Sequence, residues 1–201
     1  MATITHEPMN RSTIGNLVRR IAFYLEKKDY AIIGGVALQY LGSSRATADI
    51  DLLIPPGASA AVRGTLAKTD EFDADGATLW YNAPGGKRYN VDVLEAQKIR
   101  QAFPSSAADF ITLNSAKILR PALLLKLKCL SWLERDDDKP KKKAHDREDI
   151  RYLLTYMKAN GIRTSPQEVD TADNDFFLTY LTRYPKDRQL FEDVGLKPPA
   201  V

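Results

Sequence analysis

The chain has 201 residues, 44% of them hydrophobic, which suffices for one good core plus a small helical appendage but not for two large domains. Its 29 Lys and Arg residues nearly balance 26 Asp and Glu residues, and the net charge of +3 excludes a polycation built to coat nucleic acid. The single cysteine, Cys129, excludes an internal disulfide, and the N-terminal residues lack the apolar run of a secretory signal. We therefore expect a compact intracellular, cytoplasmic protein.

No segment approaches the roughly 20 uninterrupted apolar residues that a membrane-spanning helix needs. The nearest, residues 122–133, contains Lys126 and Lys128. We expect no membrane span.

The first part of the chain predicts a helix, a strand and a second, shorter helix. Apolar residues recur at helical spacing between Ser12 and Lys28, which predicts an amphipathic helix that packs on the core. A short apolar run, YAII, then stops at Gly34 and Gly35 and is followed by VALQYL. This pattern predicts a strand, a tight turn and a short helix.

Residues 48–54, ADIDLLI, alternate in the manner of a strand. Asp49 and Asp51 lie on one face of this predicted strand, and Ile50 and Leu52 lie on the other. After a predicted helix over residues 59–68, ATLWYN and RYNVDVL are two strand candidates joined by APGGK, which predicts a hairpin. Asp92 lies on the second strand, on the face opposite Val91 and Val93.

Helical patterns dominate from residue 107 onward. We expect helices over residues 121–134, 147–158, 173–182 and 186–194. Between the first two lies a charged segment whose part KPKKKAH we interpret as a solvated loop, with a basic patch for an RNA acceptor stem or a triphosphate as the alternative. The predicted organisation is a core over residues 1–116 and a helical region over residues 117–201 that closes a cleft.

The stretch IIGGVALQYLGSSRATADIDLLI carries the predicted chemistry. Gly34 and Gly35 allow a tight turn and a close approach of the backbone to a phosphate, while the following helix start offers unpaired N–H groups to an anion. Asp49 and Asp51 place two carboxylates about 7 Å apart along one strand face. Two such acids on a buried face repel unless a cation neutralises them, so the pair predicts a site for Mg²⁺.

Asp92 is the predicted third carboxylate of this site, delivered by a neighbouring strand. Three acids suit two metal ions about 4 Å apart, of which one lowers the pKa of the attacking hydroxyl and the other steadies the triphosphate. Asp92 is then the candidate general base as well as a metal ligand.

The order of Gly-Gly, a short helix and RATADIDLLI resembles the signature of the DNA polymerase beta-like nucleotidyltransferase superfamily. More closely, residues 28–157 resemble the minimal nucleotidyltransferases of the abortive-infection toxin type (AbiEii-like). The resemblance implies catalytic, metal-binding roles for Asp49, Asp51 and Asp92, and it implies that Arg45 and Thr47 line the nucleotide pocket with Gly34 and Gly35.

Two downstream positions are also matched by this resemblance. Lys126, in PALLLKLKCLSW, matches the lysine that contacts the triphosphate, with Lys128 as the alternative. Asp146, in KKKAHDREDIRYLL, matches the family's acidic position, although His145 stands where lysine is common. The alternative for Asp146 is that it caps a helix that begins near it.

The expected fold is α/β (α+β), with a small mixed, largely antiparallel sheet flanked by helices and a helical C-terminal region. The predicted function is Mg²⁺-dependent transfer of a nucleoside monophosphate from a nucleoside triphosphate such as ATP, with Mn²⁺ as a substitute ion. RNA, a protein and a small molecule are all open as acceptors. The alternatives are an inactive relative that binds nucleotide or a protein partner, and a toxin-like effector neutralised by a partner.

Overall fold

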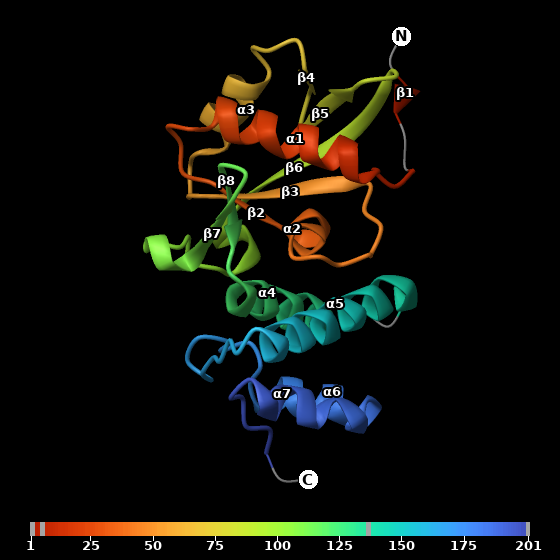
Figure 1. The fold of residues 1–201 in the computed structure, drawn as a ribbon, viewed down its shortest axis with the longest axis vertical. Coiled ribbons are helices and arrows are strands. Elements are labelled where there is room, and N and C mark those ends of the chain that lie inside the picture. Colours follow the sequence, from red (N-terminus) through yellow and green to blue (C-terminus); the bar gives the residue numbers. More distant parts are fainter. Residues whose placement is uncertain (1–2, 5–6, 136–137, 200–201) are drawn as a thin grey trace. The chain divides into compact units, whose positions relative to one another are not determined.

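The computed structural model describes residues 3–4, 7–135 and 138–199. The chain divides into two compact units, Met1–Leu119 and Arg120–Val201, and each is described by itself below (Figure 1). Within the described residues, no helix combines the length and the apolar character that crossing a membrane requires.

The first unit is built on one mixed sheet with the strand order β4-β5-β6-β3-β2-β8-β7, and β1 pairs with β6. The pairs β3/β6, β2/β8 and β1/β6 are parallel, and the remaining pairs found among the described residues are antiparallel. The expected α/β class with a mixed sheet is thereby confirmed. The strands are β1 Thr3–Ile4, β2 Ala31–Ile33, β3 Asp49–Ile54, β4 Phe72–Asp75, β5 Thr78–Ala83, β6 Lys87–Glu95, β7 Phe110–Leu113 and β8 Ala116–Leu119.

Helices α1 (Arg11–Tyr24), α2 (Gly34–Tyr40) and α3 (Ser59–Leu66) belong to this unit, with short 3-10 turns η1 (Ala96–Ile99) and η2 (Ala107–Asp109). Asn10 caps α1 by accepting a hydrogen bond from the Thr13 N–H at 2.8 Å. α1 packs against β5, β8 and α3, and α3 packs against β6. The predicted amphipathic helix is confirmed, since its buried residues are Ile14, Leu17, Val18, Ile21 and Ala22.

The hairpin predicted across APGGK is also confirmed, as β5 and β6 pair antiparallel with Tyr81 opposite Tyr89. The prediction of helical structure from residue 107 onward is wrong for β7 and β8, which form a second hairpin. Asn114 and Ser115 make its turn at φ 50° and 66°. Each strand has four residues, too few for alternation to be recognised, and β8 is held by its parallel pairing with β2 at Ile32 and Ile118.

The second unit is helical, with α4 (Pro121–Glu134), α5 (Pro140–Ala159), α6 (Asn174–Arg183), η3 (Pro185–Asp187) and α7 (Arg188–Asp193). α4 packs against α5 and α6 around Trp132, which is fully buried with its ring centroid 4.8 Å from that of Tyr180. Cys129 is fully buried beside this core, and burial raises the pKa of its thiol well above the ordinary value. Cys129 therefore acts as a small apolar residue of this core.

Helix α5 begins earlier than the sequence suggested, so the interpretation of KPKKKAH as a loop is wrong, although its residues other than Lys143 are exposed to solvent. Pro140 occupies the first turn, where its missing N–H costs no hydrogen bond. Lys143 is only 9% exposed; its Nζ donates to the Arg135 carbonyl at 3.0 Å and lies 4.8 Å from the Trp132 ring centroid. Asp146 therefore lies inside α5, and its interpretation as a helix cap is also wrong.

Two apolar residues of α1 that differ in burial allow a test of the core. Leu17 is fully buried and Phe23 is 68% exposed. We expect Leu17→Ala to lower the free energy of unfolding by about 2–5 kcal/mol because it opens a cavity, and Phe23→Ala to change it by about 0.5 kcal/mol or less. Urea unfolding followed by far-UV circular dichroism measures both, and equal losses would contradict the packing of α1.

Candidate active site

The register of the two central strands β3 and β6 brings three carboxylates to one face of the sheet. β3 pairs parallel with β6, with Asp49 opposite Asn90 and Asp51 opposite Asp92. Neighbouring strands lie about 4.8 Å apart, and residues paired in register point to the same face. Asp49, Asp51 and Asp92 therefore share a face, while Ile50, Leu52 and Val91 are buried on the other.

Neutral donors hold two of these carboxylates. The Thr47 hydroxyl donates to Asp49 Oδ1 at 2.9 Å, and the Asn90 amide donates to Asp92 Oδ1 at 2.7 Å. Asp49 is exposed, and Asp51 and Asp92 are half-buried. Within the described part of the chain, no three His, Cys, Asp or Glu side chains are gathered closely enough to form a ready-made metal cluster. The carboxylates of Asp49 and Asp92 are each oriented by the residue two positions earlier in the sequence, Thr47 and Asn90.

Gly34 leaves room for the Asp51 carboxylate. β2 runs antiparallel to β3 with Ile33 opposite Asp51, and the chain then turns into α2 through Gly34 at φ +67°. A Cβ on Gly34 would lie 1.8 Å from Asp51 Oδ2, so any side chain there would occupy the position of the carboxylate. Glycine is required both by the left-handed backbone and by the close approach.

Gly35 lies against Arg45 and Thr47, in the segment that precedes β3. A Cβ on Gly35 would lie 2.6 Å from the Thr47 hydroxyl oxygen and 3.4 Å from an Arg45 guanidinium nitrogen. This segment is tied down because the Gln39 amide donates to the Arg45 carbonyl at 2.6 Å and the Met9 N–H donates to the Thr47 carbonyl at 2.8 Å. With Asp92 opposite Asp51 on β6, the structure thus brings together seven of the sequence-predicted residues: Gly34, Gly35, Arg45, Thr47, Asp49, Asp51 and Asp92.

A cavity of about 400 Å³ opens beside Asp49 and Asp92, and its lining includes Arg63, Trp80 and Asn90. Sequence reasoning missed these three. Asn90 could have been found, because it lies two residues before Asp92 on the same predicted strand face, and Trp80 follows from the hairpin register that places it opposite Asn90. Nothing in the sequence points to Arg63, which α3 supplies.

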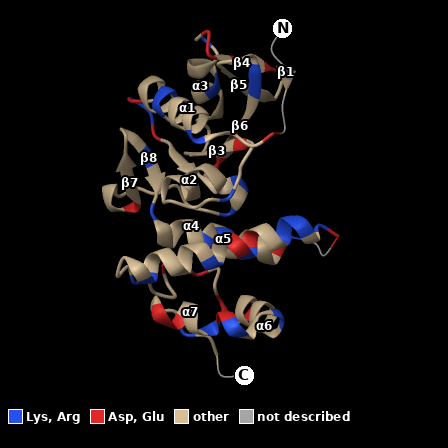
Figure 2. Ribbon diagram, turned by 45° about the vertical axis from the view of Figure 1, so that its right-hand side comes forward, with Lys and Arg blue, Asp and Glu red and all other residues tan. Residues whose placement is uncertain are grey.

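The remaining predicted residues, Lys126 and Asp146, belong to the second unit. The Lys126 ammonium is 2.8 Å from Asp170 Oδ1. Asp146 and Asp149, at 2% and 1% side-chain exposure, share the Lys128 ammonium at 3.2 and 2.7 Å, and Arg135 also pairs with Asp146. Figure 2 shows basic residues at the start of α5 and interleaved acidic and basic residues further along it.

No family model matches the sequence, and neither does any curated protein. Among solved structures, JHP933 from Helicobacter pylori has a similar fold, with a TM-score of 0.52 and 14% identity over 92% of this chain and 79% of that chain. At that identity the likeness establishes the fold alone.

Two other solved structures align at lower scores. The lincosamide antibiotic adenylyltransferase LnuA, in its lincomycin-bound structure, has a TM-score of 0.43 and 10% identity over 74% of this chain and 99% of that chain. The antibiotic-resistance factor ANT(2'')-Ia has a TM-score of 0.49 and 14% identity over 92% of this chain and 99% of that chain. Likeness at these scores carries no inference about function.

The close approach of Gly34 to Asp51 predicts that a single methyl group added at position 34 greatly lowers the stability of the protein. We expect Gly34→Ala to lower the free energy of unfolding by about 2 kcal/mol or more, because it adds a clash to a left-handed backbone. Gly15→Ala is the matched control: it lies in α1 with open space around its Cβ position, and it should be neutral or stabilising by about 0.5–1 kcal/mol. Denaturant unfolding separates the two, and a neutral Gly34→Ala would disprove the close approach.

The two lysines of α4, Lys126 and Lys128, should contribute unequally to the stability of the protein. Lys128 serves two buried carboxylates, whereas the Asp170 partner of Lys126 is 58% exposed. We expect Lys128→Met to cost about 3 kcal/mol of stability and Lys126→Met to cost less than about 1 kcal/mol. Thermal and urea unfolding of both variants measures this difference, and the reverse order would contradict the pairing.

Proposed function

We propose that the chain is a divalent-metal-dependent nucleotidyltransferase. It transfers a nucleoside monophosphate from a nucleoside triphosphate to an acceptor and releases pyrophosphate. The observation that carries this proposal is the placement of Asp49, Asp51 and Asp92 on one face of two neighbouring parallel strands, with Gly34 against the Asp51 carboxylate.

The donor chemistry of these residues fits Mg²⁺, with Mn²⁺ as a substitute. Carboxylate oxygens are the ligands that such hard cations prefer. Within the described residues, no basic side chain pairs with Asp49 or Asp92, and each accepts only from a neutral group, Thr47 or Asn90. Their negative charge is thus oriented but not neutralised by the protein, which is the arrangement expected of metal ligands with supporting hydrogen bonds.

Asp49, Asp51 and Asp92 would hold two ions, which when bound would lower the pKa of the acceptor hydroxyl and stabilise charge on the triphosphate. Asp92 also accepts the proton of that hydroxyl. The acceptor oxygen then bonds to the α-phosphorus, and the bond from that phosphorus to the pyrophosphate oxygen breaks.

The other residues act on the nucleotide. Gly34 and Gly35 let the backbone approach a phosphate, and Arg45 and Thr47 line the nucleotide pocket. For Lys126 and Asp146 the nucleotide-binding role stays a prediction, since Lys126 is paired with Asp170 and Asp146 is buried beside Lys128.

Isothermal titration of each nucleoside triphosphate, with Mg²⁺ and with EDTA, tests the proposal. We expect binding that requires Mg²⁺ and that disappears in the Asp49→Ala/Asp51→Ala variant. Such binding justifies a screen of RNA, protein and small-molecule acceptors by release of pyrophosphate. If no triphosphate binds, the inactive, partner-binding alternative replaces the proposal.

Asp51→Asn separates chemistry from folding. The amide has nearly the shape of the carboxylate but lacks its charge, so we expect an unchanged far-UV spectrum and a loss of transfer of about 100-fold or more. Asp29→Asn removes an exposed carboxylate that lies outside the strands and should leave activity unchanged. Radiolabel transfer from the triphosphate is the measurement, and a variant at position 51 with most of its activity would refute the metal assignment.

A further inference from the structure

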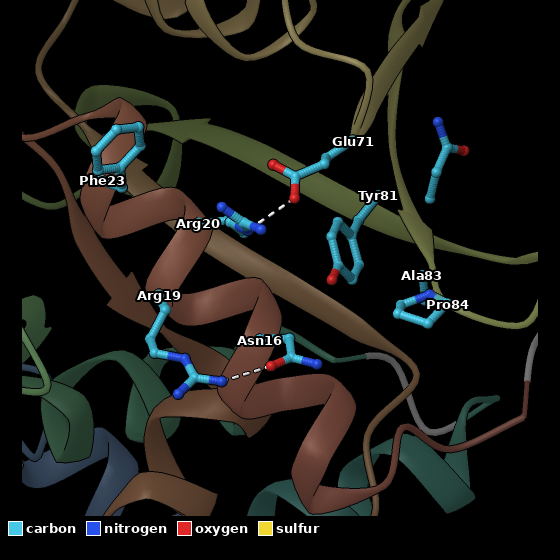
Figure 3. Close-up of a pocket in the computed structure, with 9 residues that line it drawn as sticks. Asn16, Arg19, Arg20, Phe23, Glu71, Tyr81, Ala83 and Pro84 are labelled. Carbon is cyan, nitrogen blue, oxygen red and sulfur yellow. Dashed lines mark hydrogen bonds and ion pairs between the residues drawn. The ribbon is translucent and has the colours of Figure 1, made fainter.

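A second cavity, of about 630 Å³, lies between α1 and the hairpin of β5 and β6 (Figure 3). α1 supplies Asn16, Arg19, Arg20 and Phe23 to its lining, and the hairpin supplies Tyr81 and Pro84. Its volume falls within the range of small-molecule sites, about 300–1,000 Å³.

This cavity is separate from the candidate active site. On β5, Trp80 pairs with Asn90 and so shares the face of the carboxylates, whereas the next residue, Tyr81, pairs with Tyr89 and faces the other way. A ligand beside Tyr81 therefore lies across the sheet from Asp49 and Asp92.

Tyr81 supplies an unused polar group. Tyr81 is only 3% exposed, and Figure 3 shows its hydroxyl directed into the space beside α1. Within the described residues, this hydroxyl forms no hydrogen bond. Burial raises the pKa of the phenol, so it stays protonated and able to donate.

The charges around Tyr81 leave one cation available to a ligand. Glu71 uses both of its oxygens, since Oε1 pairs with Arg20 at 2.7 Å and Oε2 accepts from the Tyr24 hydroxyl at 2.6 Å. Arg19 binds only the Asn16 amide oxygen, at 2.5 Å, and no described carboxylate pairs with it. The cavity lining therefore holds two guanidinium groups against one carboxylate.

The same stretch of α1 offers one exposed aromatic side chain, Phe23. Asn16, Arg19 and Phe23 stand at positions i, i+3 and i+7, so they share one helix face. Phe23 is 68% exposed and lines the cavity. An anion bound at Arg19 would have an aromatic ring within one helical turn.

We propose that this cavity binds a small organic monoanion, in which one carboxylate, sulfonate or phosphate group is joined to an apolar ring. Arg19 binds the anionic group, the Tyr81 hydroxyl donates a hydrogen bond to it, and the ring packs on Phe23. The site is independent of nucleotide transfer.

Fluorescence titration with anilinonaphthalene sulfonate, a ring-bearing monoanion, tests the site on the full chain. We expect saturable binding to one site, weakened about tenfold by Arg19→Gln and about threefold by Tyr81→Phe, because an ion pair with a guanidinium exceeds a hydrogen bond from a neutral hydroxyl to the same anion. Arg11→Gln removes an exposed cation from the first turn of α1, outside the cavity, and should bind like the unmodified chain.

Two controls make the outcome decisive. Phenylnaphthylamine has similar rings without the sulfonate, and its binding should not respond to Arg19→Gln. Because such dyes also bind partly unfolded proteins, each variant must keep a cooperative thermal transition.

Asp51→Asn should bind the dye normally, so failure of the proposed transferase activity leaves this result unaffected. Absence of dye binding, or equal affinity in Arg19→Gln, Tyr81→Phe and Arg11→Gln, would overturn the proposal.

Discussion

The parallel pairing of β3 with β6 is the constraint on which the candidate active site depends. Side chains alternate along a strand, so a slip of one residue would turn Asp92 toward the opposite face. The register is held by that opposite face, where Ile50, Leu52 and Val91 are buried and cannot be exposed without large loss of apolar burial. Packing beneath the sheet thus fixes where the carboxylates stand above it.

The need for glycine at position 34 also follows from the pairing of β3, in this case with β2. β2 pairs with β3 so that Ile33 lies opposite Asp51, and the chain must leave the sheet immediately afterwards to form α2. The turn uses a positive φ, and the space that a Cβ would fill holds the Asp51 carboxylate. The glycine is therefore explained by local sterics, and a bound phosphate is not needed to account for it.

Local patterns in the sequence predicted those parts of the molecule that local forces determine. Alternation placed Asp49 and Asp51 on one face, and turn residues predicted the hairpin that carries Asp92. The adjacency of Asp92 to Asp51 could only be anticipated as an option, because β3 and β6 are separated in the chain by α3, β4 and β5. β8 was missed for a related reason: its four residues owe their conformation to pairing with β2, which no local pattern records.

The run Lys141–Lys143 shows how tertiary contacts override composition. Three consecutive lysines are typical of a solvated loop, yet the third is buried against the Trp132 ring and donates to a backbone carbonyl. The length of α5 follows from this burial and from the pairing of Asp146 with Lys128, neither of which is visible as periodicity.

The buried carboxylates of the second unit are paired with cations, whereas Asp49 and Asp92 of the first unit accept hydrogen bonds from neutral groups. In the second unit, Asp146 and Asp149 share Lys128, and Asp187 is 3.3 Å from Arg147 while accepting from the Tyr180 hydroxyl at 3.0 Å. A buried carboxylate that serves only packing needs such a cation, because desolvation of an unpaired charge costs several kcal/mol.

On the central strands of the first unit, Asp49 and Asp92 are oriented by a hydroxyl and an amide, which supply no positive charge. A divalent cation would balance the charge of Asp49 and Asp92, so the proposed metal role rests on this electrostatic argument as well as on the order of motifs in the chain.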